Sequence, residues 1–524
     1  MDTLQILASN IIQWSALTLL FMFGLGILYI AALYIIDKTQ TEQTIRRNYP
    51  VVGRFRYFFE HLGEFFRQYF FSMDREELPF NRAERSWVYR AAKKVDTTIA
   101  FGSTRPLNHQ GEPIFINCPF PTLDEDAIAP KEITIGEGYA ETPYTTNSII
   151  NISGMSFGAI SKPAVLALSR GAKEAGIWMN TGEGGLSPYH LEGGCDIVYQ
   201  IGTAKYGVRT PEGELSDEKL KAVARHPQVK MFEIKMSQGA KPGKGGILPG
   251  VKVTAEIASI RGINVGQDSI SPNGHLDIAS IDDLLDMINR VRSVTGKPVG
   301  FKTVVGHLGF FNTLCEKIHE RGIKSAPDFI TLDSADGGTG AAPQPLMDYM
   351  GMDIQESLPT VIDIISSYGL KPRIKIIASG KLMIPGKVAW ALSAGADFVT
   401  SARGFMFALG CIQALQCNKN TCPTGITTHK KSLQQGLVPE NKAVRVANFA
   451  NKIVYGVGLI AHSCGVKEPR GLCRKHVRII QHGGRSLPFE EIYPIPSVRA
   501  EYLEAVEVKG AEVREDKLNP STYS

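Results

Sequence analysis

Apolar and polar positions divide this chain into two parts with different patterns. Residues 11–36 contain no charged side chain, and these roughly 26 positions exceed the ~20 that a helix needs to cross the hydrocarbon core of a membrane. From about residue 95 onward, short apolar runs that end in Gly, Ser or Asp alternate with stretches of helical periodicity. This alternation is typical of βα units built around a parallel sheet.

Eight short segments are the candidate strands of this sheet. They cover residues 149–152, 178–180, 231–235, 268–271, 299–304, 329–333, 374–379 and 398–400. Helical patterns separate most of the runs, at residues 163–175, 281–294, 308–321 and 385–394. Residues 181–230 are too long for a simple crossover, and we expect them to form an insertion between the second and third strands.

Eight strands indicate a closed barrel, so the predicted fold class is α/β, a (β/α)8 TIM barrel with an N-terminal transmembrane helix. In such a barrel the chemistry lies at the C-terminal ends of the strands, and phosphate often binds after strands seven and eight. A doubly wound open sheet is the structural alternative. Because no Gly-x-Gly-x-x-Gly follows an early strand, a nicotinamide-binding unit of that type has no support.

The N-terminal apolar segment predicts a single-pass membrane protein. Only Asp2 precedes the segment, whereas five basic residues follow it closely, namely Lys38, Arg46, Arg47, Arg54 and Arg56. The positive-inside rule therefore places the downstream catalytic domain in the cytoplasm. A cleavable signal peptide is the alternative, but no Lys or Arg precedes the run, the run is too long and no small-residue cleavage site follows it.

The residues after the segment mix aromatic side chains with arginine. Residues 56–71 predict either an amphipathic segment that lies along the membrane surface or an ordinary helix that packs on the catalytic domain. These changes of pattern divide the chain into four regions. They are a transmembrane anchor at 1–40, a juxtamembrane amphipathic or linker region at 41–95, the barrel at 96–480 and a C-terminal extension at 481–524.

Composition narrows the class of protein. With 524 residues, 43% of them hydrophobic, and 52 glycines, the chain is long enough for a large core with many tight strand-to-helix turns. A net charge of +5 is small for this size, and without a basic face interleaved with aromatic residues we expect no nucleic-acid partner. Eight cysteines are too sparse for a disulfide scaffold, which indicates reduced thiols in a reducing compartment.

Three of the cysteines predict an iron–sulfur site. Cys411, Cys417 and Cys422 are separated by five and then four residues. Three thiolates without a fourth at comparable spacing suit a three-iron cluster better than a tetrahedral zinc site. The alternative is that all three are buried packing residues in a helix and loop, since Cys is among the most buried residue types.

A small-residue turn at residues 401–404 directly precedes the three cysteines, and residues 378–381 end the seventh predicted strand in a similar way. Small side chains let the backbone approach a ligand closely, so such turns can offer N–H groups to a phosphate. The pattern therefore predicts a phosphorylated cofactor beside the iron–sulfur cluster.

Other strand ends carry longer motifs. They read MSFGAIS at residues 155–161, GEGG at 182–185, KMSQGAKPG at 235–243, DGGTGAAP at 336–343 and NTCP at 420–423. In this order the motifs resemble the FMN-binding synthase domain of the glutamate synthase family, over roughly residues 145–430. The resemblance implies FMN on the barrel and a [3Fe-4S] cluster on Cys411, Cys417 and Cys422.

The resemblance also implies the catalytic and substrate-binding residues. Glu183, Lys235 and Lys241 match catalytic positions, and the Glu183 carboxylate could hold ammonia or move protons to an imine. A helix-capping acid is the alternative for Glu183. Arg261 and Gln238 match positions that bind 2-oxoglutarate, where arginine suits a bidentate hold on a carboxylate; a surface arginine on a helix is the alternative for Arg261.

The flavin-binding residues follow from the same resemblance. Lys302 lies midway along a barrel strand, where it could face the flavin's pyrimidine edge and stabilise negative charge on the reduced ring. A lysine held in a salt bridge inside the barrel is the alternative. The other predicted flavin-binding residues lie at strand ends and are Ser153, Gly154, Met155, Ser156, Gly337, Gly338, Gly340, Gly380, Lys381, Ala402, Arg403 and Gly404.

The implied reaction is reductive amination. Ammonia and 2-oxoglutarate condense to 2-iminoglutarate, and hydride transfer from reduced FMN produces L-glutamate. Electrons reach FMN one at a time through the cluster, from a ferredoxin or a separate flavoprotein. A monomer and a homo-oligomer are both compatible with the sequence.

Two departures from the family pattern change these expectations. Met1 and Asp2 lead directly into the apolar segment, where the large enzyme has a glutaminase domain with an N-terminal cysteine, so we expect a stand-alone, membrane-anchored synthase domain without glutamine hydrolysis. Ile247 replaces a glutamine expected to hydrogen-bond at the keto-acid site, a change that can redirect specificity. Two alternatives follow, an FMN oxidoreductase acting on a different amino or keto acid, and a membrane-tethered electron relay or redox sensor without turnover.

Overall fold

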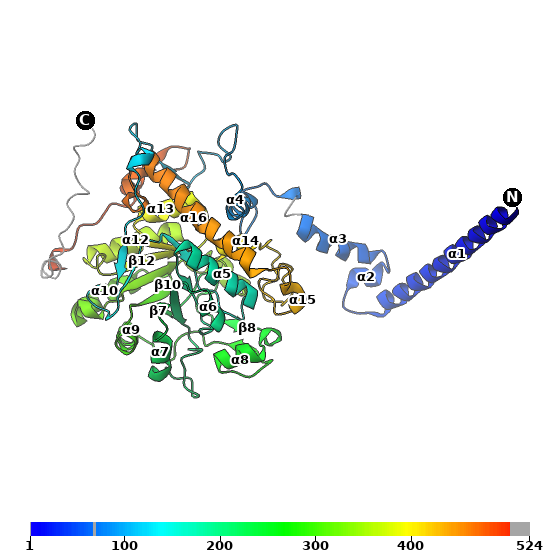
Figure 1. The fold of residues 1–524 in the computed structure, drawn as a ribbon, viewed down its shortest axis with the longest axis horizontal. Coiled ribbons are helices and arrows are strands. Elements are labelled where there is room, and N and C mark those ends of the chain that lie inside the picture. The colour runs from blue at the N-terminus through cyan, green and yellow to red at the C-terminus, as the bar shows by residue number, and fades with distance from the viewer. Residues whose placement is uncertain (1, 67–69, 503–524) are drawn as a thin grey trace. The chain divides into compact units, whose positions relative to one another are not determined.

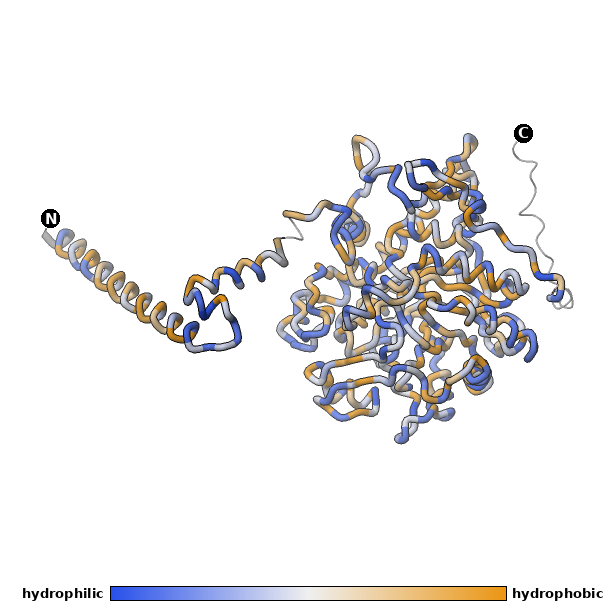
Figure 2. The backbone as a smooth tube through the Cα atoms, turned by 180° about the vertical axis from the view of Figure 1, so that it is seen from behind, coloured by the Kyte–Doolittle hydropathy of each residue, from blue (hydrophilic) through white to orange (hydrophobic). Residues whose placement is uncertain are grey.

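The computed structural model of the protein describes residues 2–66 and 70–502 and divides the chain into two units, Met1–Ala83 and Glu84–Ser524. The first unit contains α1 (Asp2–Thr39), α2 (Thr44–Asn48) and α3 (Gly53–Phe66) (Figure 1). The tube of α1 is mostly apolar along its length (Figure 2). Its stretch Gln5–Thr39 is long and apolar enough to cross a membrane, a test that an N-terminal signal sequence also passes.

The second unit contains a closed barrel of eight parallel strands, which confirms the predicted fold class (Figure 1). In chain order the strands are β4 (Ile150–Ile152), β5 (Met179–Asn180), β6 (Ile197–Ile201), β7 (Val229–Lys235), β10 (Val299–Val304), β11 (Phe329–Asp333), β12 (Lys375–Ser379) and β13 (Phe398–Ser401). The barrel closes where β13 pairs in parallel with β4. The C-terminal ends of all eight strands therefore meet on one face of the barrel.

Two of the predicted strand assignments are wrong. β6 lies inside the predicted insertion at residues 181–230, is buried along its whole length and pairs in parallel with β5 and β7. Residues 268–271 instead contain β9 (Ser269–Ile270), which pairs antiparallel with β8 (Ile247–Leu248) outside the barrel. Residues 268–271 read Asp-Ser-Ile-Ser, whereas β6 reads Ile-Val-Tyr-Gln-Ile, so the missed segment is the more apolar of the two. The insertion consequently lies between β7 and β10.

Predicted helices at four places agree with the structure to within a residue or two. They are α5 (Lys162–Ala175), α9 (Ile281–Thr295), α10 (Gly309–Arg321) and α13 (Pro385–Ala394). Local sequence explains their ends: the Ser161 side chain accepts a hydrogen bond from the Ala164 N–H at the start of α5, and Gly176 ends that helix in the left-handed conformation.

The other helices of the second unit cover the barrel and its loops. They are α6 (Pro188–Glu192), α7 (Asp217–Ala224), α8 (Ala255–Arg261), α11 (Gln344–Tyr349), α12 (Ile354–Ser367), α14 (Arg403–Leu409), α15 (Lys431–Gln434), α16 (Pro439–Ser463) and α17 (Phe489–Ile492), while α4 (Arg82–Ala92) begins at the boundary of the units. α5 and α16 lie side by side (Figure 1). Their contact requires Gly171, where an added Cβ would lie 2.5 Å from the Val446 Cβ.

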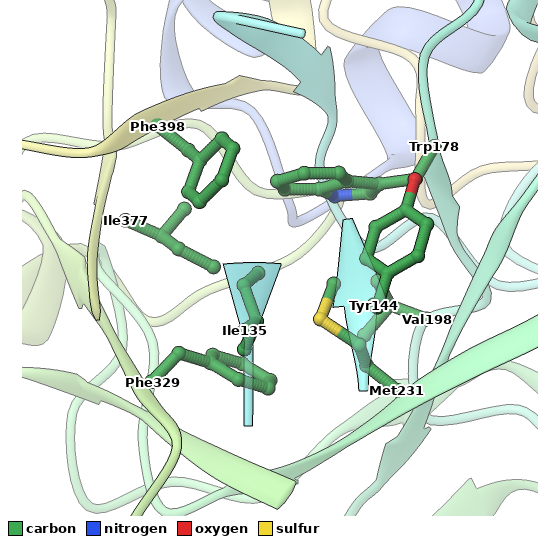
Figure 3. Packing of buried hydrophobic residues seen from close by; sticks show 8 residues of the cluster. All are labelled: Ile135, Tyr144, Trp178, Val198, Met231, Phe329, Ile377 and Phe398. Carbon is green, nitrogen blue, oxygen red and sulfur yellow. The ribbon is translucent and has the colours of Figure 1, made fainter. Parts of the chain in front are cut away.

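An antiparallel hairpin of β2 (Ile133–Ile135) and β3 (Tyr144–Thr146) packs into the apolar cluster at the N-terminal end of the barrel. Ile135 and Tyr144 contribute from the hairpin, and six residues contribute from the beginnings of the barrel strands or just before them (Figure 3). Those six are Trp178, Val198, Met231, Phe329, Ile377 and Phe398. This end of the barrel is thus filled by a hydrophobic core, and the polar chemistry is left to the opposite end. A further sheet of three strands joins β1 (Pro113–Phe115), β14 (Val477–Ile480) and β15 (Ser486–Pro488).

Truncation of this cluster should strongly destabilise the second unit. The Phe329 side chain is fully buried, so we expect Phe329→Ala to lower the free energy of unfolding by about 3–5 kcal/mol, through lost apolar burial and the cavity left behind. Urea denaturation of the detergent-solubilised chain, followed by near-UV circular dichroism, measures this loss. The matched control is Leu276→Ala, because Leu276 is 87% exposed; equal losses in both variants would contradict the role of the cluster.

Candidate active site

One pocket lies at the C-terminal ends of the barrel strands. Residues from β7 and β10, the loops after β4, β5 and β11, and the turn after β13 line it together with α8 and β8. The predicted site residues that line it are Gly154, Met155, Ser156, Glu183, Lys235, Gln238, Lys241, Arg261, Lys302, Gly338, Gly340, Ala402, Arg403 and Cys417. The predicted residues outside its lining are Ser153, Gly337, Gly380, Lys381, Gly404, Cys411 and Cys422.

A charged group occupies one side of the pocket. The Glu183 carboxylate forms an ion pair of 2.9 Å with the Lys235 ammonium, and Lys241 and Arg261 are near enough to act on it electrostatically. Burial raises the pKa of Glu183, but these cations, Lys235 foremost, outweigh burial and leave the pKa below its usual range. Glu183 is therefore a carboxylate at neutral pH, which suits it to hold an ammonium ion better than to donate a proton.

Lys241 is a pocket lysine whose pKa is lowered by its surroundings. Burial, together with the nearby Lys235 ammonium, lowers the pKa of Lys241 to about 8, although Glu183 acts in the opposite direction. Its Nζ lies 3.4 Å from the Gly245 carbonyl oxygen. A lysine that changes charge near pH 8 can give a proton to a bound substrate, which a lysine of ordinary pKa does poorly at that pH.

Arg261 is buried in the pocket wall, so the alternative of a surface arginine is wrong. Only 5% of the residue is exposed, and its guanidinium makes long contacts of 3.2 Å to the Ser269 hydroxyl and 3.4 Å to the Ser156 hydroxyl. Within the described residues, its Nε has no hydrogen-bond partner. A buried guanidinium with spare N–H groups is well suited to bind a carboxylate in two-point fashion.

Lys302 lies at the bottom of the pocket inside a buried polar network. It forms an ion pair of 3.1 Å with Asp333 and lies near Glu233. Burial lowers the pKa of Lys302, but these two carboxylates outweigh burial and raise the pKa above its usual value. The Lys302 side chain forms the salt bridge of the alternative and also lines the pocket.

The network under the pocket was not predicted. The Glu233 carboxylate accepts hydrogen bonds from the Asn180 amide at 2.8 Å, the Gln200 amide at 2.7 Å and the Thr331 hydroxyl at 2.6 Å. Gln200 also lines the pocket, and it lies on β6, the strand that the sequence reading missed. β6 reads Ile-Val-Tyr-Gln-Ile, so the available signal was one polar residue near the C-terminal end of an apolar run.

Two glycines leave bare backbone in the pocket wall, Gly154 after β4 and Gly182 after β5. A Cβ at Gly154 would lie 2.9 Å from the Asn180 Oδ1 and 3.1 Å from the Gln200 Nε2, and a Cβ at Gly182 would lie 2.6 Å from the Ser156 N. Side chains are therefore excluded at both positions. A wall without side chains beside a buried lysine fits a flat ring system with an anionic edge, which is the chemistry of a flavin.

The turns after β12 and β13 lie next to one another, because these strands pair in parallel. An added Cβ at Gly380 would lie 2.2 Å from the Ser334 Cβ, so only glycine fits there. The Lys381 ammonium pairs with Asp336 at 2.9 Å, and the Arg403 guanidinium donates to the Thr339 carbonyl at the pocket edge. Two cations and two small-residue turns at adjacent strand ends suit a phosphate group.

The three predicted cluster cysteines lie on the loop after α14. The Arg403 guanidinium contacts the Cys417 Sγ at 3.7 Å, and the Cys422 Sγ lies 3.3 Å from the Thr424 hydroxyl. Burial raises the pKa of Cys411, and the neighbouring Cys417 and Cys422 add to that rise. In the described part of the chain no three Cys, His, Asp or Glu side chains are gathered as a metal site, so the cluster stays a prediction, although three neighbouring thiols are a donor set that fits iron.

Lys252 is a further pocket residue that the sequence reading missed. Only 2% of the residue is exposed, and its ammonium donates to the Ala159 carbonyl at 2.7 Å and the Cys417 carbonyl at 3.3 Å. It thus ties the loop after β4 to the cysteine loop. Asn420 supports the same loop, since its amide donates to the Val251 carbonyl at 3.2 Å and its side-chain oxygen accepts from the His429 N–H at 2.7 Å.

Known proteins resemble this chain over most of its length. The conserved region in glutamate synthase matches residues 122–467. The glutamate synthase large subunit-like protein YerD of Bacillus subtilis is 40% identical over 494 residues, which are 87% of this chain and 93% of that protein. Archaeal glutamate synthase (NADPH) of Methanocaldococcus jannaschii is 36% identical over 326 residues, which are 62% of this chain and 60% of that protein.

Among solved structures, a mutant of the active chimera of (S)-mandelate dehydrogenase aligns with 75% of this chain and 98% of its own, at 12% identity and a TM-score of 0.44. The match to the glutamate synthase region covers well over half of the chain, and the strand-end motifs lie within it. This chain therefore belongs to the glutamate synthase family.

Proposed function

We propose that this chain is an FMN- and iron–sulfur-dependent oxidoreductase that reductively aminates 2-oxoglutarate with ammonia to L-glutamate. The observation that best supports this proposal is the pocket that is lined by Glu183, Lys235, Lys241 and Arg261 together with Lys302. The reaction consumes 2-oxoglutarate, an ammonium ion, two electrons and two protons, and it yields L-glutamate and water. Membership of the glutamate synthase family supports this reaction class.

The residues of the pocket divide the work between binding and proton transfer. Arg261 holds a carboxylate of 2-oxoglutarate, while Glu183 holds the ammonium ion next to the carbonyl carbon. The ammonium ion passes one proton to Glu183, and its nitrogen then attacks the carbonyl carbon. The carbonyl oxygen leaves as water with one proton from Lys241 and one from Glu183, and Lys241 recovers a proton from the nitrogen as the protonated imine forms. Lys241 and Arg261 are buried, which strengthens the contacts they make relative to bulk water.

Two groups that the chain would bind complete the proposal. FMN, held by Gly154, Lys302 and the turns at Gly380 and Ala402, would supply hydride to the imine carbon when reduced. Cys411, Cys417 and Cys422 would hold the [3Fe-4S] cluster, and a ferredoxin or a separate flavoprotein would supply the electrons. The same proposal includes α1 as a single-pass membrane anchor, with the second unit in the cytoplasm.

The direct test uses the full chain, purified without oxygen and supplied with FMN, iron and sulfide. With ammonium, 2-oxoglutarate and chemically reduced ferredoxin, we expect L-glutamate in proportion to the electrons consumed. Absence of glutamate while the absorbance spectrum shows bound flavin would reject the reaction.

A second candidate is an FMN oxidoreductase of the same scaffold that acts on a different 2-oxo acid. Ile247 favours it, because this residue lines the pocket with 37% of its surface exposed and offers a substrate no side-chain hydrogen bond. A site built around an apolar side chain discriminates by packing more than by polar contacts. A screen of 2-oxo acids, followed through flavin reoxidation, separates the two, since a higher kcat/KM for an apolar 2-oxo acid favours the second candidate.

The pKa of Lys241 makes a pH profile informative. Because the pKa lies at about 8, the lysine is protonated below pH 8 and neutral above it, so we expect kcat/KM for the 2-oxo acid to fall as pH rises through about 8. Lys241→Arg should remove this fall, since arginine stays protonated. Lys244→Arg is the control, as Lys244 is an exposed lysine on the same loop. If the fall in kcat/KM persists unchanged in Lys241→Arg, another titrating group causes it.

A further inference from the structure

The first unit contains a buried ion cluster at the end of α1. The Asp37 side chain has no exposed surface. Its carboxylate accepts hydrogen bonds from Arg46 at 2.8 and 2.9 Å, from Arg54 at 2.7 Å through two nitrogens, and from the Val51 N–H at 3.0 Å. Charge-assisted bonds of this kind are strong and geometrically specific. They hold the chain that follows α1 back against the end of that helix.

The start of α3 belongs to the same arrangement. Arg54 is the second residue of α3, and the Gly53 N–H donates to the Tyr49 carbonyl at 2.7 Å. A Cβ at Gly53 would lie 2.8 Å from the Ile45 carbonyl oxygen, so α2 and α3 approach so closely that only glycine fits. The position of α3 relative to the end of α1 is therefore set by the cluster of Asp37, Arg46 and Arg54.

α3 presents one apolar stripe that nothing in the described residues covers. Val52, Phe55, Phe59 and Phe66 follow helical spacing, and Phe55 and Phe59 are 60% and 61% exposed. By the same spacing His61 lies on the opposite face and Glu60 on the flank. Contiguous exposed aromatic side chains are rare on soluble surfaces and mark an interaction site.

The length of the charge-free part of α1 determines the depth in a bilayer at which the chain after α1 emerges. Residues 11–36 as a helix span roughly 39 Å, which is more than the ~30 Å hydrocarbon core. Asp37 and Lys38, the first charged residues after the span, therefore emerge at the polar boundary of a bilayer that α1 crosses. The Asp37 cluster attaches α3 at that level, and Arg46, Arg47, Arg54 and Arg56 supply positive charge to it.

We propose that α3 lies in the headgroup interface of the bilayer that α1 spans, with its phenylalanine stripe in the acyl boundary and its arginines among anionic lipid headgroups. An amphipathic helix with aromatic side chains on one face and arginine on the flanks binds such an interface by apolar burial and charge attraction. The ion pairs of Asp37 with Arg46 and Arg54 fix the orientation of α3 relative to the end of α1. This inference rests on α1 as a retained anchor, and it is independent of the reaction in the barrel.

The test uses the full chain in phosphatidylcholine and phosphatidylglycerol vesicles whose acyl chains carry bromine near the headgroup. Trp14 lies in α1, so a Trp14→Phe background removes its signal, and the three other tryptophans are subtracted as a constant. In this background Phe59→Trp should be quenched about twofold more by brominated lipid than His61→Trp, whereas aqueous acrylamide should quench His61→Trp more. His61→Trp is the matched control, because His61 is exposed and lies on the opposite face of α3.

Three results would overturn the proposal. Acrylamide quenching that is equal in both variants would place the stripe in water, and shielding of Phe59→Trp from acrylamide and bromine alike would show that protein, such as a second copy of α3, covers it. An intact mass that lacks the N-terminal residues would show that α1 is removed as a signal sequence. Asp37→Asn in the Phe59→Trp chain tests the cluster: we expect bromine quenching to fall by about half while the chain still floats with vesicles, and unchanged quenching would refute its role.

Discussion

Replacement of Glu183 by Gln should lower the rate of L-glutamate formation by about 10²–10⁴-fold while FMN stays bound. The variant keeps the size of the side chain but removes the only carboxylate that pairs with Lys235 in the pocket lining. Two lysines and Arg261 then surround an amide, and a cationic pocket repels the ammonium ion that the reaction consumes. The loss should therefore appear in kcat and also as a higher KM for ammonium.

The measurement is steady-state glutamate formation with reduced ferredoxin, together with the flavin absorbance of each preparation. Glu192→Gln is the matched control, because Glu192 forms an ion pair of 2.7 Å with Arg170 on the surface, away from the pocket. A Glu183→Gln protein with unchanged kcat and unchanged KM for ammonium would show that this carboxylate does not hold the substrate.

Replacement of Cys417 by Ala should remove the iron–sulfur cluster and stop the ferredoxin-driven reaction. A three-iron cluster held by three thiolates cannot lose one of them without losing most of its binding free energy. Of the three cysteines only Cys417 lines the pocket, so we expect its replacement to break the electron path to the flavin. Activity driven by ferredoxin should fall by at least about 100-fold, while FMN stays bound.

Iron analysis and electron paramagnetic resonance of the oxidised protein measure the cluster, and flavin absorbance measures FMN. Cys118→Ser is the control, since Cys118 lies outside the pocket lining and outside the cysteine loop. Wild-type protein that binds FMN but takes up no iron, or Cys417→Ala protein that keeps the cluster signal, would contradict the assignment of these ligands.

The barrel could be predicted from the sequence because the pattern of each βα unit depends on residues that are close together in the chain. Apolar runs, Ser caps and left-handed glycines mark where strands and helices begin and end, and α5 and α13 were placed to within a residue. The choice of barrel strands could not be made locally. β6 is an apolar run inside a longer polar segment, and β9 lies in the mostly polar residues 268–271. Their pairing partners decide that the first belongs to the barrel and the second does not.

The candidate site divides in the same way. Motifs at the strand ends, through their resemblance to the family, implied Glu183, Lys235 and Lys241 as site residues, and the resemblance alone implied Arg261, which lies on α8. The structure brings all four into one pocket, where the C-terminal ends of the parallel strands meet. The interaction partners of these residues could not be predicted from the sequence. Neither the ion pair of Glu183 with Lys235 nor the burial that brings the pKa of Lys241 to about 8 follows from any spacing along the chain.

The sequence by itself thus determined the apolar span, the eight-stranded class of fold and most residue types at the strand ends, since all of these depend on neighbours a few positions apart. Tertiary structure alone decided which strands close the barrel, how Glu233 gathers Asn180, Gln200 and Thr331 beneath the pocket, and how Asp37 holds the start of α3. The physical reason is that hydrogen bonding, burial and charge coupling act over a few ångströms in space. Chain closure brings together residues whose separation in sequence carries no information about their contact.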